Sequence, residues 1–429
     1  MVSVAIIGGG PGGIGTARVL IENDRSYHID IFEGSSKIGG VWNYDPTSNN
    51  TAMYEVLETN ISDHLMSYQG FRLDIKDASG KIYPTRQQVQ EYLESYYDSK
   101  VASYPKLRLF TNKAVNSLKK VDSHWEVNAE NDDFTYMYDY VVVANGHFNK
   151  PFVPTVPGSL EWVNQSHSKD FVSCKHFQGM NVVVVGNATS AIDIATQLST
   201  TAAKVYQSVK PDAKAVLPDE SIIKVVPQIK SLHAGSSNKI QLIDGTSIED
   251  IDHIIWATGF QYDIPFLKSY QSDLFRDQSN RLFNLWEHIV YRPDPTIFFS
   301  LLMKQIIPFQ LAELQASIMD LVISGSIAAA DITNAPYDSL NDNIHEVPSA
   351  DYHLVQSPKD IQYYRHLQDI IDKQNLNSPF KPVLWTDDLA KERENCSKLK
   401  AQRQQLLVKW AIHQRSAHEP YTIPDSTFE

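Results

Sequence analysis

Cysteine is almost absent from this sequence. The chain has 429 residues and only two cysteines, Cys174 and Cys396, which lie far apart. No Cys-x-x-Cys pair exists, which argues against thioredoxin-like dithiol chemistry and against zinc ribbons. The sequence also contains no clustered metal ligands and no Ser-His-Asp motif, so we expect neither a metal site nor hydrolysis by such a triad.

Basic runs and long apolar runs are lacking as well. The net charge is −13, and no run of lysine and arginine could form the basic patch that binds nucleic acid. The longest apolar stretch, Leu311 to Ala330, contains Glu313, Gln315 and Asp320. It predicts a packed amphipathic helix, because a transmembrane segment needs about 20 mostly apolar residues. Without a signal peptide, we expect a soluble cytoplasmic protein; peripheral attachment to the endoplasmic reticulum and a homodimer stay open.

A βαβ unit with a glycine-rich turn begins the chain. The pattern predicts a strand over Val2–Ile7, a helix over Pro11–Asp24 and a strand over His28–Phe32. In the turn, Gly8, Gly10 and Gly13 form G-x-G-x-x-G, and Glu33 ends the second strand. Such a turn brings the backbone and a helix N-terminus against a pyrophosphate, while the acid accepts hydrogen bonds from ribose. The alternative is a tight strand–helix turn without a ligand.

A second βαβ unit follows, with predicted strands over Asn181–Val185 and Lys204–Ser208 and a helix over 188–198. Its turn has the weaker form G-x-A-x-x-A. No acid ends its second strand, whereas Ser208 and Lys210 offer a hydroxyl and a cation to a 2′-phosphate, which favours NADPH over NADH. Lys210 as a solvated surface lysine is the alternative. The residues assigned to this nucleotide are Gly186, Ala188, Ser190, Ser208 and Lys210.

Further elements complete the α/β pattern, and no sequence repeat is visible. We expect a helix over Thr85–Ser99, hairpin strands over Leu107–Asn128, strands over Tyr140–Ala144 and His253–Ala257, and a charged helix over Asp387–Gln414. The predicted fold has two Rossmann-like dinucleotide-binding domains, with an NADPH-binding domain at 166–259 inserted into an FAD-binding domain formed by 1–165 and 260–429.

Several segments resemble the flavin-containing monooxygenase family, in its short, soluble, microbial form. They span roughly residues 3 to 320 and include Gly39-Gly40-Val41-Trp42, Tyr54-Glu55-Val56-Leu57-Glu58-Thr59-Asn60, Asn145-Gly146-His147, Ala257-Thr258-Gly259-Phe260, and Pro308-Phe309 with Glu313 and Gln315. The family fingerprint between the domains is incomplete, because Glu161 and Val163 replace its Phe and Gly. The role of His167, which fits that fingerprint, is therefore left open.

The resemblance implies FAD and NADPH as cofactors, and O₂ and a small nucleophile as substrates. NADPH would reduce FAD, and O₂ would give a C4a-hydroperoxyflavin that oxygenates the sulfur or nitrogen of a thiol, thioether or amine. It assigns cofactor-binding roles to Gly40, Trp42, Thr258, Gly259 and Gln315. Asn60, with Thr59 as a second candidate, would stabilise negative charge on the reacting oxygen. A turn asparagine at Asn60 and core packing at Trp42 are the alternatives.

Other readings use the same two nucleotide folds. A Baeyer–Villiger or N-hydroxylating monooxygenase would differ only in its product. An NADPH-dependent flavoprotein reductase would pass electrons to a disulfide or a partner, although the missing Cys-x-x-Cys argues against the disulfide version. A non-catalytic nucleotide sensor would keep FAD for structure alone.

Overall fold

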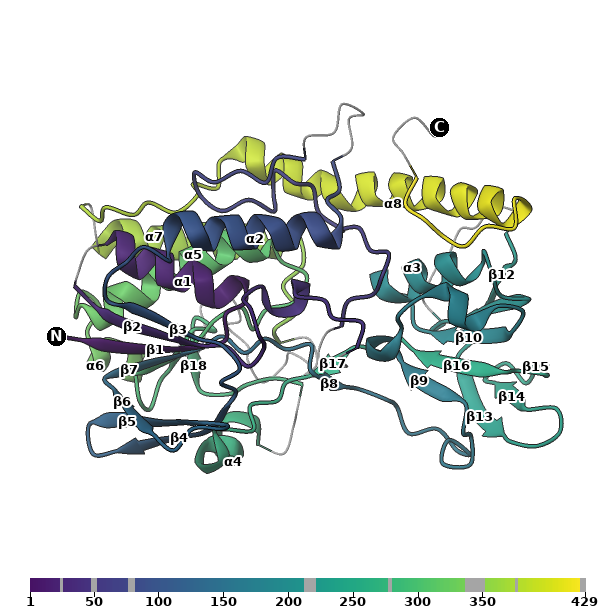
Figure 1. The fold of residues 1–429 in the computed structure, drawn as a ribbon, viewed down its shortest axis with the longest axis horizontal. Helices are drawn as coiled ribbons and strands as arrows, with labels where there is room; N and C mark the ends of the chain where they lie inside the picture. The colour runs from purple at the N-terminus through teal and green to yellow at the C-terminus, as the bar shows by residue number, and fades with distance from the viewer. Residues whose placement is uncertain are drawn as a thin grey trace.

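The structure is a computed structural model in which two α/β units lie side by side (Figure 1). It describes residues 1–23, 26–47, 52–75, 82–211, 221–276, 280–335, 352–374 and 377–424. Extended connectors join the two units, and the longest helix runs over both of them (Figure 1).

The first unit is built on a seven-stranded sheet with the order β18-β19-β20-β7-β1-β2-β3. The strands from β20 to β3 are parallel, and β19 and β18 extend one edge by antiparallel pairing. On β1, Val4 and Ile6 face one core, whereas Ala5 and Ile7 face another. This two-sided burial explains the continuous apolar run. The strand bounds are β1 Ser3–Ile7, β2 His28–Phe32, β3 Leu107–Phe110, β7 Tyr140–Val143, β18 Leu285–Trp286, β19 Val290–Tyr291 and β20 Ile297–Phe299.

The second unit is built on a five-stranded parallel sheet with the order β12-β11-β10-β16-β9. Its strands β10 and β11 have the bounds that the sequence predicts. The bounds are β9 Gln165–His167, β10 Asn181–Val185, β11 Lys204–Ser208, β12 Ile223–Val226 and β16 His253–Trp256. This unit lies in the chain between β7 and β20 of the first sheet, so it is an insertion, as predicted.

The two units share a core topology. The strand order β3-β2-β1-β7 corresponds to β12-β11-β10-β16, and a three-stranded antiparallel sheet precedes β7 and β16. The next strands, β20 and β9, hold the same place in the sheet, but β20 follows β7 in the chain whereas β9 precedes β10. The sequence shows no repeat because topology depends on the apolar pattern more than on residue identity. The additional strands are β4 Val115–Val121, β5 His124–Ala129, β6 Thr135–Tyr138, β13 Ile229–His233, β14 Lys239–Leu242 and β15 Ser247–Ile248, and the connectors pair through β8 Lys150–Pro151 and β17 Phe260–Gln261.

The predicted hairpin over Leu107–Asn128 is wrong for its first strand. β3 pairs in parallel with β2, with Phe110 opposite Phe32, and only β4 and β5 form a hairpin. After β3 the chain turns at Asn112, whose φ is 54°. Strands adjacent in sequence need not pair, and here the main sheet provides the more deeply buried partner.

The helices flank the two sheets. Thr85 caps α2 through a capping box with Gln88, which explains the start of that helix. The bounds are α1 Pro11–Glu22, α2 Arg86–Lys100, α3 Thr189–Leu198, α4 Gln271–Phe275, α5 Pro308–Ile323, α6 Ala329–Asn334, α7 Lys359–Gln374 and α8 Asp387–Ser416, with short 3₁₀ helices at Gly40–Trp42, Ser168–Asp170, Cys174–Phe177 and Lys268–Tyr270.

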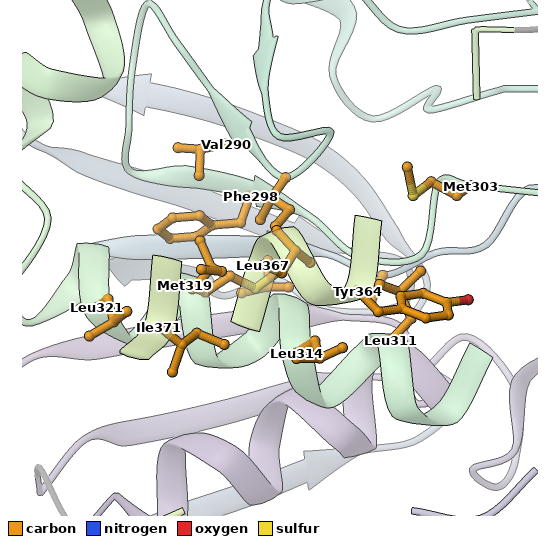
Figure 2. Packing of buried hydrophobic residues seen from close by; sticks show 14 of the residues in the cluster. Val290, Phe298, Met303, Leu311, Leu314, Met319, Leu321, Tyr364, Leu367 and Ile371 are labelled. Carbon is orange, nitrogen blue, oxygen red and sulfur yellow. The ribbon is translucent and has the colours of Figure 1, made fainter. Parts of the chain in front are cut away.

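Helix α5 is buried on every side, so the expected amphipathic helix at Leu311–Ala330 is wrong in both character and length. Every residue from Phe309 to Ile323 is buried. Figure 2 shows Leu311, Leu314 and Met319 of this helix packed with Phe298 of β20 and Leu367 of α7. Its polar side chains face partners rather than water. Among the described residues, no helix is long and apolar enough to cross a membrane.

Helix α8, of 30 residues, connects the two units. Its C-terminal half lies over α3 (Figure 1), where Arg415 donates to the carbonyl of Ala202 over 2.7 Å. The predicted domain division assigns all of 260–429 to the FAD-binding domain, and it stays a prediction. The end of that segment nevertheless packs on the second unit.

Candidate functional site

The first glycine turn leaves no room for side chains. Gly8 has a φ of +113°, and a Cβ on it would lie 2.4 Å from the carbonyl oxygen of Ala144. A Cβ on Gly13 would lie 1.9 Å from the carbonyl oxygen of Gly8. Gly10 is the N-cap of α1 and has no side-chain cap. The first N–H groups of α1 are therefore open to an anion, as at a pyrophosphate site.

Glu33 holds this turn in place. Its Oε2 accepts a hydrogen bond from the backbone N–H of Gly9 at 2.8 Å, and its Oε1 accepts from the backbone and hydroxyl of Ser35 at 2.8 Å. The side chain is buried, at the end of β2. Glu33 thus lies where a ribose-binding acid is expected, and its Oε2, which accepts only from Gly9 among the described residues, retains a lone pair for a ligand.

The loop at Gly39–Trp42 packs directly on the first turn. Gly39 donates from its N–H to the carbonyl of Gly9 over 2.9 Å. A Cβ on Gly40, whose φ is +57°, would lie 2.8 Å from the Cα of Gly10. Trp42 is partly buried against the cluster that contains Ile14. The sequence therefore brings together Gly40 and the glycine turn, while the indole of Trp42 belongs at least in part to the core.

Two buried polar atoms, one beside α1 and one beside this loop, have no partner among the described residues. The Ser300 hydroxyl follows β20 and would lie 2.7 Å from a Cβ on Gly12, in the first turn of α1. The Gln90 Oε1 lies 2.0 Å from where a Cβ on Gly39 would be. Buried polar groups normally have partners, so these atoms fit a bound dinucleotide. Sequence reasoning missed both, although a polar residue ending an apolar strand is a usable signal for Ser300.

The second glycine turn has the same geometry as the first. Gly186 has a φ of +138°, and its Cβ would lie 2.5 Å from the carbonyl oxygen of Ala257. Ala188 is the N-cap of α3 with φ −85° and ψ 174°, close to the −79° and −174° of Gly10. That extended conformation accepts a Cβ, so alanine can replace glycine there. Ser190 is exposed in the first turn of α3.

A hydrophobic residue replaces the acid in the second turn. The N–H of Gly8 donates to the carbonyl of Phe32, and the N–H of Gly186 donates to the carbonyl of Ser208. The next residues, Glu33 and Val209, therefore occupy equivalent positions. Val209 is buried, and Lys210 beside it is exposed. The second unit therefore has no carboxylate at the ribose position, as the sequence predicts.

The hydroxyl of Ser208 is directed inward. It donates to the carbonyl of Pro227 over 3.0 Å, and Ser208 is 2% exposed. Gln207, which the sequence reasoning did not single out, donates from Nε2 to the carbonyl of Gly186 over 3.1 Å. Gln207 thus fastens the second turn, as Glu33 fastens the first. Lys210 remains the more accessible of the two groups predicted for a 2′-phosphate.

Thr258 and Gly259 lie where the chain leaves the second sheet. The Thr258 hydroxyl donates to the carbonyl of Phe152, and Gly259, with a φ of +85°, is exposed. His167 donates from Nε2 to the carbonyl of Gly259 over 3.0 Å, and its Nδ1 accepts from the N–H of Lys169 at 3.1 Å. Both ring nitrogens of His167 are thus occupied within the connector, so the structure gives it a packing role.

Thr59 and Asn60 differ in exposure. Thr59 is buried, and its hydroxyl donates to the carbonyl of Ile61 over 2.7 Å. Asn60 is exposed and makes no hydrogen bond with the part of the chain that the structure describes. Of the two catalytic candidates, Asn60 is therefore the one whose side chain is available to a ligand.

Gln315 supports the segment after β20 from within α5. The side chain is fully buried, and its Oε1 accepts from the N–H of Leu301 at 2.9 Å. Leu301 has a φ of 55°, which is unusual for leucine. Gln315 thus holds the segment that carries Ser300, and its predicted role in cofactor binding stays a prediction.

His147 adds a neutral group at the end of β7. Burial is the main cause that lowers the pKa of His147 to about 3, and the positive charge of Lys304 lowers it further. A hydrogen bond with the backbone of Leu301 has the opposite, smaller effect. An uncharged imidazole at neutral pH can fix the backbone without adding a charge to the site.

These features match a known family over most of the chain. A family model described as pyridine nucleotide-disulphide oxidoreductase matches residues 5–288. The thiol-specific monooxygenase of Saccharomyces cerevisiae is 36% identical over 98% of this chain and 97% of its own length. The chain belongs to the flavin-containing monooxygenases. It is therefore an oxidoreductase, and its family membership implies the use of FAD and NADPH.

Other members of this family align over long stretches. The Arabidopsis thaliana flavin-containing monooxygenase FMO GS-OX5 is 27% identical over 76% of this chain and 74% of its own length. The structure of S-allyl-L-cysteine S-oxygenase from Allium sativum has a TM-score of 0.81 at 23% identity, over 97% of this chain and 98% of that one. The latter likeness shows that the two chains share a fold.

Proposed function

We propose that this flavin-containing monooxygenase uses NADPH and O₂ to oxygenate soft nucleophiles, with the sulfur of small thiols and thioethers as the main target. The observation that carries the proposal is the full-length likeness to a thiol-specific monooxygenase at 36% identity. The paired glycine turns support it, because the second turn has Val209 in place of an acid. Amines are the second class of nucleophile that the same chemistry accepts.

We propose that the first turn, with Gly8, Gly10, Gly13 and Glu33, holds FAD, and that the second, with Gly186, Ala188, Ser190, Ser208 and Lys210, holds NADPH. The corresponding domains are 1–165 with 260–429, and 166–259. Bound FAD would supply hydride acceptance from NADPH and activation of O₂, chemistry in which one oxygen atom would pass to the substrate and the other would leave as water.

The protein's own contribution is binding, orientation and exclusion of water. The Asn60 amide, which is free of intramolecular bonds among the described residues, would donate to the oxygen on which negative charge develops. An amide has no proton to lose at neutral pH, so it stabilises charge without diverting the reaction. Gly40, Thr258 and Gly259 would line the nucleotides through their backbones.

Asn60→Ala tests the catalytic assignment. We expect unchanged flavin content and NADPH oxidation, while oxygenated product per NADPH falls about tenfold or more and hydrogen peroxide rises, since losing one such donor is costly. Product and peroxide are measured together with a thiol, a thioether and a tertiary amine. Asn128→Ala, on β5 and bonded to Thr135, is the control. An unchanged product yield would remove Asn60 from the mechanism.

The other readings are separated by adding a cyclic ketone, a primary amine and a disulfide to this substrate panel. A cyclic ketone converted to an ester would indicate a Baeyer–Villiger enzyme, and a primary amine converted to a hydroxylamine would indicate an N-hydroxylating one. NADPH consumption that requires a disulfide but no O₂ would indicate a reductase. Any of these results would replace S-oxygenation as the function.

A further inference from the structure

Helix α8 contacts the segment that carries Asn60 at several points. Glu392 accepts from the Ser62 hydroxyl at 3.2 Å and lies 2.7 Å from Nδ1 of His64. About two and three turns further along the helix, Lys400 and Arg403 reach Glu58. The helix therefore lies along residues 58–64, although some 330 residues separate the two in sequence.

Glu58 is the centre of a buried ion cluster. Its side chain is 3% exposed, and those of Lys400 and Arg403 are 18% and 13% exposed. Arg403 donates from Nε to Oε1 over 3.1 Å and from Nη2 to Oε2 over 2.8 Å, a bidentate pair. Lys400 donates to Oε1 over 3.3 Å. Two cations thus face this carboxylate, and the charge of Lys400 also acts on the nearby carboxylate of Asp193.

The second cation has another acceptor, the backbone beside Asn60. Lys400 Nζ donates to the carbonyl oxygen of Thr59 over 3.0 Å, closer than its contact with Glu58. On the other side, the N–H of Thr59 donates to the carbonyl of Pro84 over 2.8 Å. Both peptide groups of Thr59 are therefore fixed, and the backbone that enters Asn60 is held while its side chain stays exposed.

The same helix also contacts the second unit. Gln404, next to Arg403, donates to the Thr196 hydroxyl of α3 over 2.9 Å. In turn, Gln197 of α3 donates to the carbonyl of Val56 over 2.7 Å. Segment 56–60, α8 and α3 thus form one connected group of contacts, so the position of Asn60 depends on both units.

We propose that Lys400 and Arg403 are positioning residues that, through Glu58 and the Thr59 carbonyl, set the place of Asn60 relative to both nucleotide turns. The proposal rests on the function proposed above. A buried ion pair is weak support for a role in stability, because desolvation offsets its attraction. A role in geometry instead predicts that small displacements lower the yield of product, since misplacement by about 1 Å can cost about 100-fold in rate.

Arg403→Lys and Lys400→Met test the proposal. The first keeps the charge and loses the bidentate geometry, and the second removes the bond to the Thr59 carbonyl. We expect product per NADPH to fall about threefold or more in each, with peroxide rising to match. Flavin content, the rate of flavin reduction by NADPH, and the KM for NADPH should stay within about twofold of wild type.

Two variants on the same helix serve as matched controls. Arg415→Lys changes an arginine that donates to the carbonyls of Ser199 and Ala202 and does not touch segment 56–60. Lys391→Met removes an exposed lysine that pairs with Asp388. Both should keep the wild-type yield of product, so a loss confined to Arg403 and Lys400 cannot come from general damage to α8.

The outcomes separate this proposal from the function on which it rests. If wild type yields no oxygenated product from the panel, the function fails. If wild type yields product and both α8 variants match their controls, the positioning role is overturned. If Lys400→Met is isolated without flavin, the yield of product per NADPH from Arg403→Lys alone decides whether the positioning role holds. Combining Asn60→Ala with Arg403→Lys should lower the yield no further than Asn60→Ala alone, whereas additive losses would also overturn the proposal.

Discussion

At the residue scale, the difference between the two units is concentrated at one position. Glu33 and Val209 occupy equivalent positions in two turns of the same shape. Each directly follows the residue whose carbonyl accepts a hydrogen bond from the first glycine of its turn. A carboxylate at this place accepts hydrogen bonds from a ribose and repels a 2′-phosphate. Valine there removes the repulsion, and the neighbouring exposed Lys210 provides a positive charge.

Val209→Glu and Lys210→Ala should therefore reverse or weaken the preference for NADPH. We expect each to raise the KM for NADPH about tenfold or more, about 1.4 kcal/mol, and to change the KM for NADH much less. Steady-state flavin reduction with both coenzymes gives the two values. Lys204→Ala, at the exposed start of β11, is the control. Equal effects on both coenzymes would place the 2′-phosphate elsewhere.

Residues with local signals could be predicted, and those that depend on distant contacts could not. Gly8 and Gly186 were predictable because a positive φ and a close backbone restrict each position to glycine. The polar atoms of Ser300 and Gln90, and the cations of α8, reach the site only through folding. The inward hydroxyl of Ser208 also depends on a tertiary contact, with Pro227.

At the element scale, the packing of α1 on α5 depends on a buried ion pair. Arg18 Nη1 lies 2.8 Å from Glu313 Oε1, and the two side chains are 5% and 0% exposed. Tyr96 and the N–H of Gln69 also donate to this carboxylate. Burial raises the pKa of Glu313 to about 7 in spite of the opposing charge of Arg18.

Arg18→Met should destabilise the protein in a pH-dependent way. Removing one partner of a buried pair typically costs about 3–5 kcal/mol. Without Arg18, the ionised Glu313 is buried without its cation, whereas protonated Glu313 carries no charge that needs one. The loss of unfolding free energy should therefore be larger at pH 8 than at pH 6. Urea unfolding at both values measures it, and Glu313→Gln in the same background should remove the pH dependence. The exposed pair Lys37–Glu94 is the control, since Lys37→Met should cost less than about 1 kcal/mol. A pH-independent loss would contradict this account.

The same scale shows which elements the sequence could predict. The bounds of β2, β10 and β11 were predictable, since their apolar runs are bordered by turns and caps. The pairing of β3 and the burial of α5 were not. Each depends on what lies opposite: β2 for β3, and Phe298 and Leu367 for α5 (Figure 2). Polar residues inside α5 suggested a solvent-exposed face, but their side chains make hydrogen bonds with buried partners.

At the scale of the whole molecule, several contacts join the two units, which share a core topology. One of these contacts lies beside the predicted catalytic segment, where the Tyr54 hydroxyl donates to Asp193 of α3. Gln197 donates to the same carboxylate over 3.1 Å. Burial raises the pKa of Asp193 to about 6, partly offset by the Tyr54 hydrogen bond and the charge of Lys400. The link between the units thus contains a carboxylate that titrates just below neutral pH.

Asp193→Asn should raise the melting temperature at pH 8, because it keeps an acceptor for Tyr54 and removes a buried charge. A shift of about two pKa units corresponds to at most about 3 kcal/mol. The folded-state pKa lies above the unfolded one, so the destabilisation by the ionised carboxylate is complete above pH 6 and decreases as the pH falls from about 6 toward 3.8. The advantage of the variant should therefore shrink between pH 8 and pH 5. Asp244→Asn is the control: the Thr246 hydroxyl lowers the pKa of Asp244, so that residue stays charged throughout and its effect should be constant. If the advantage of Asp193→Asn does not change with pH, Asp193 does not titrate in this range, and the contact between the units is insensitive to pH.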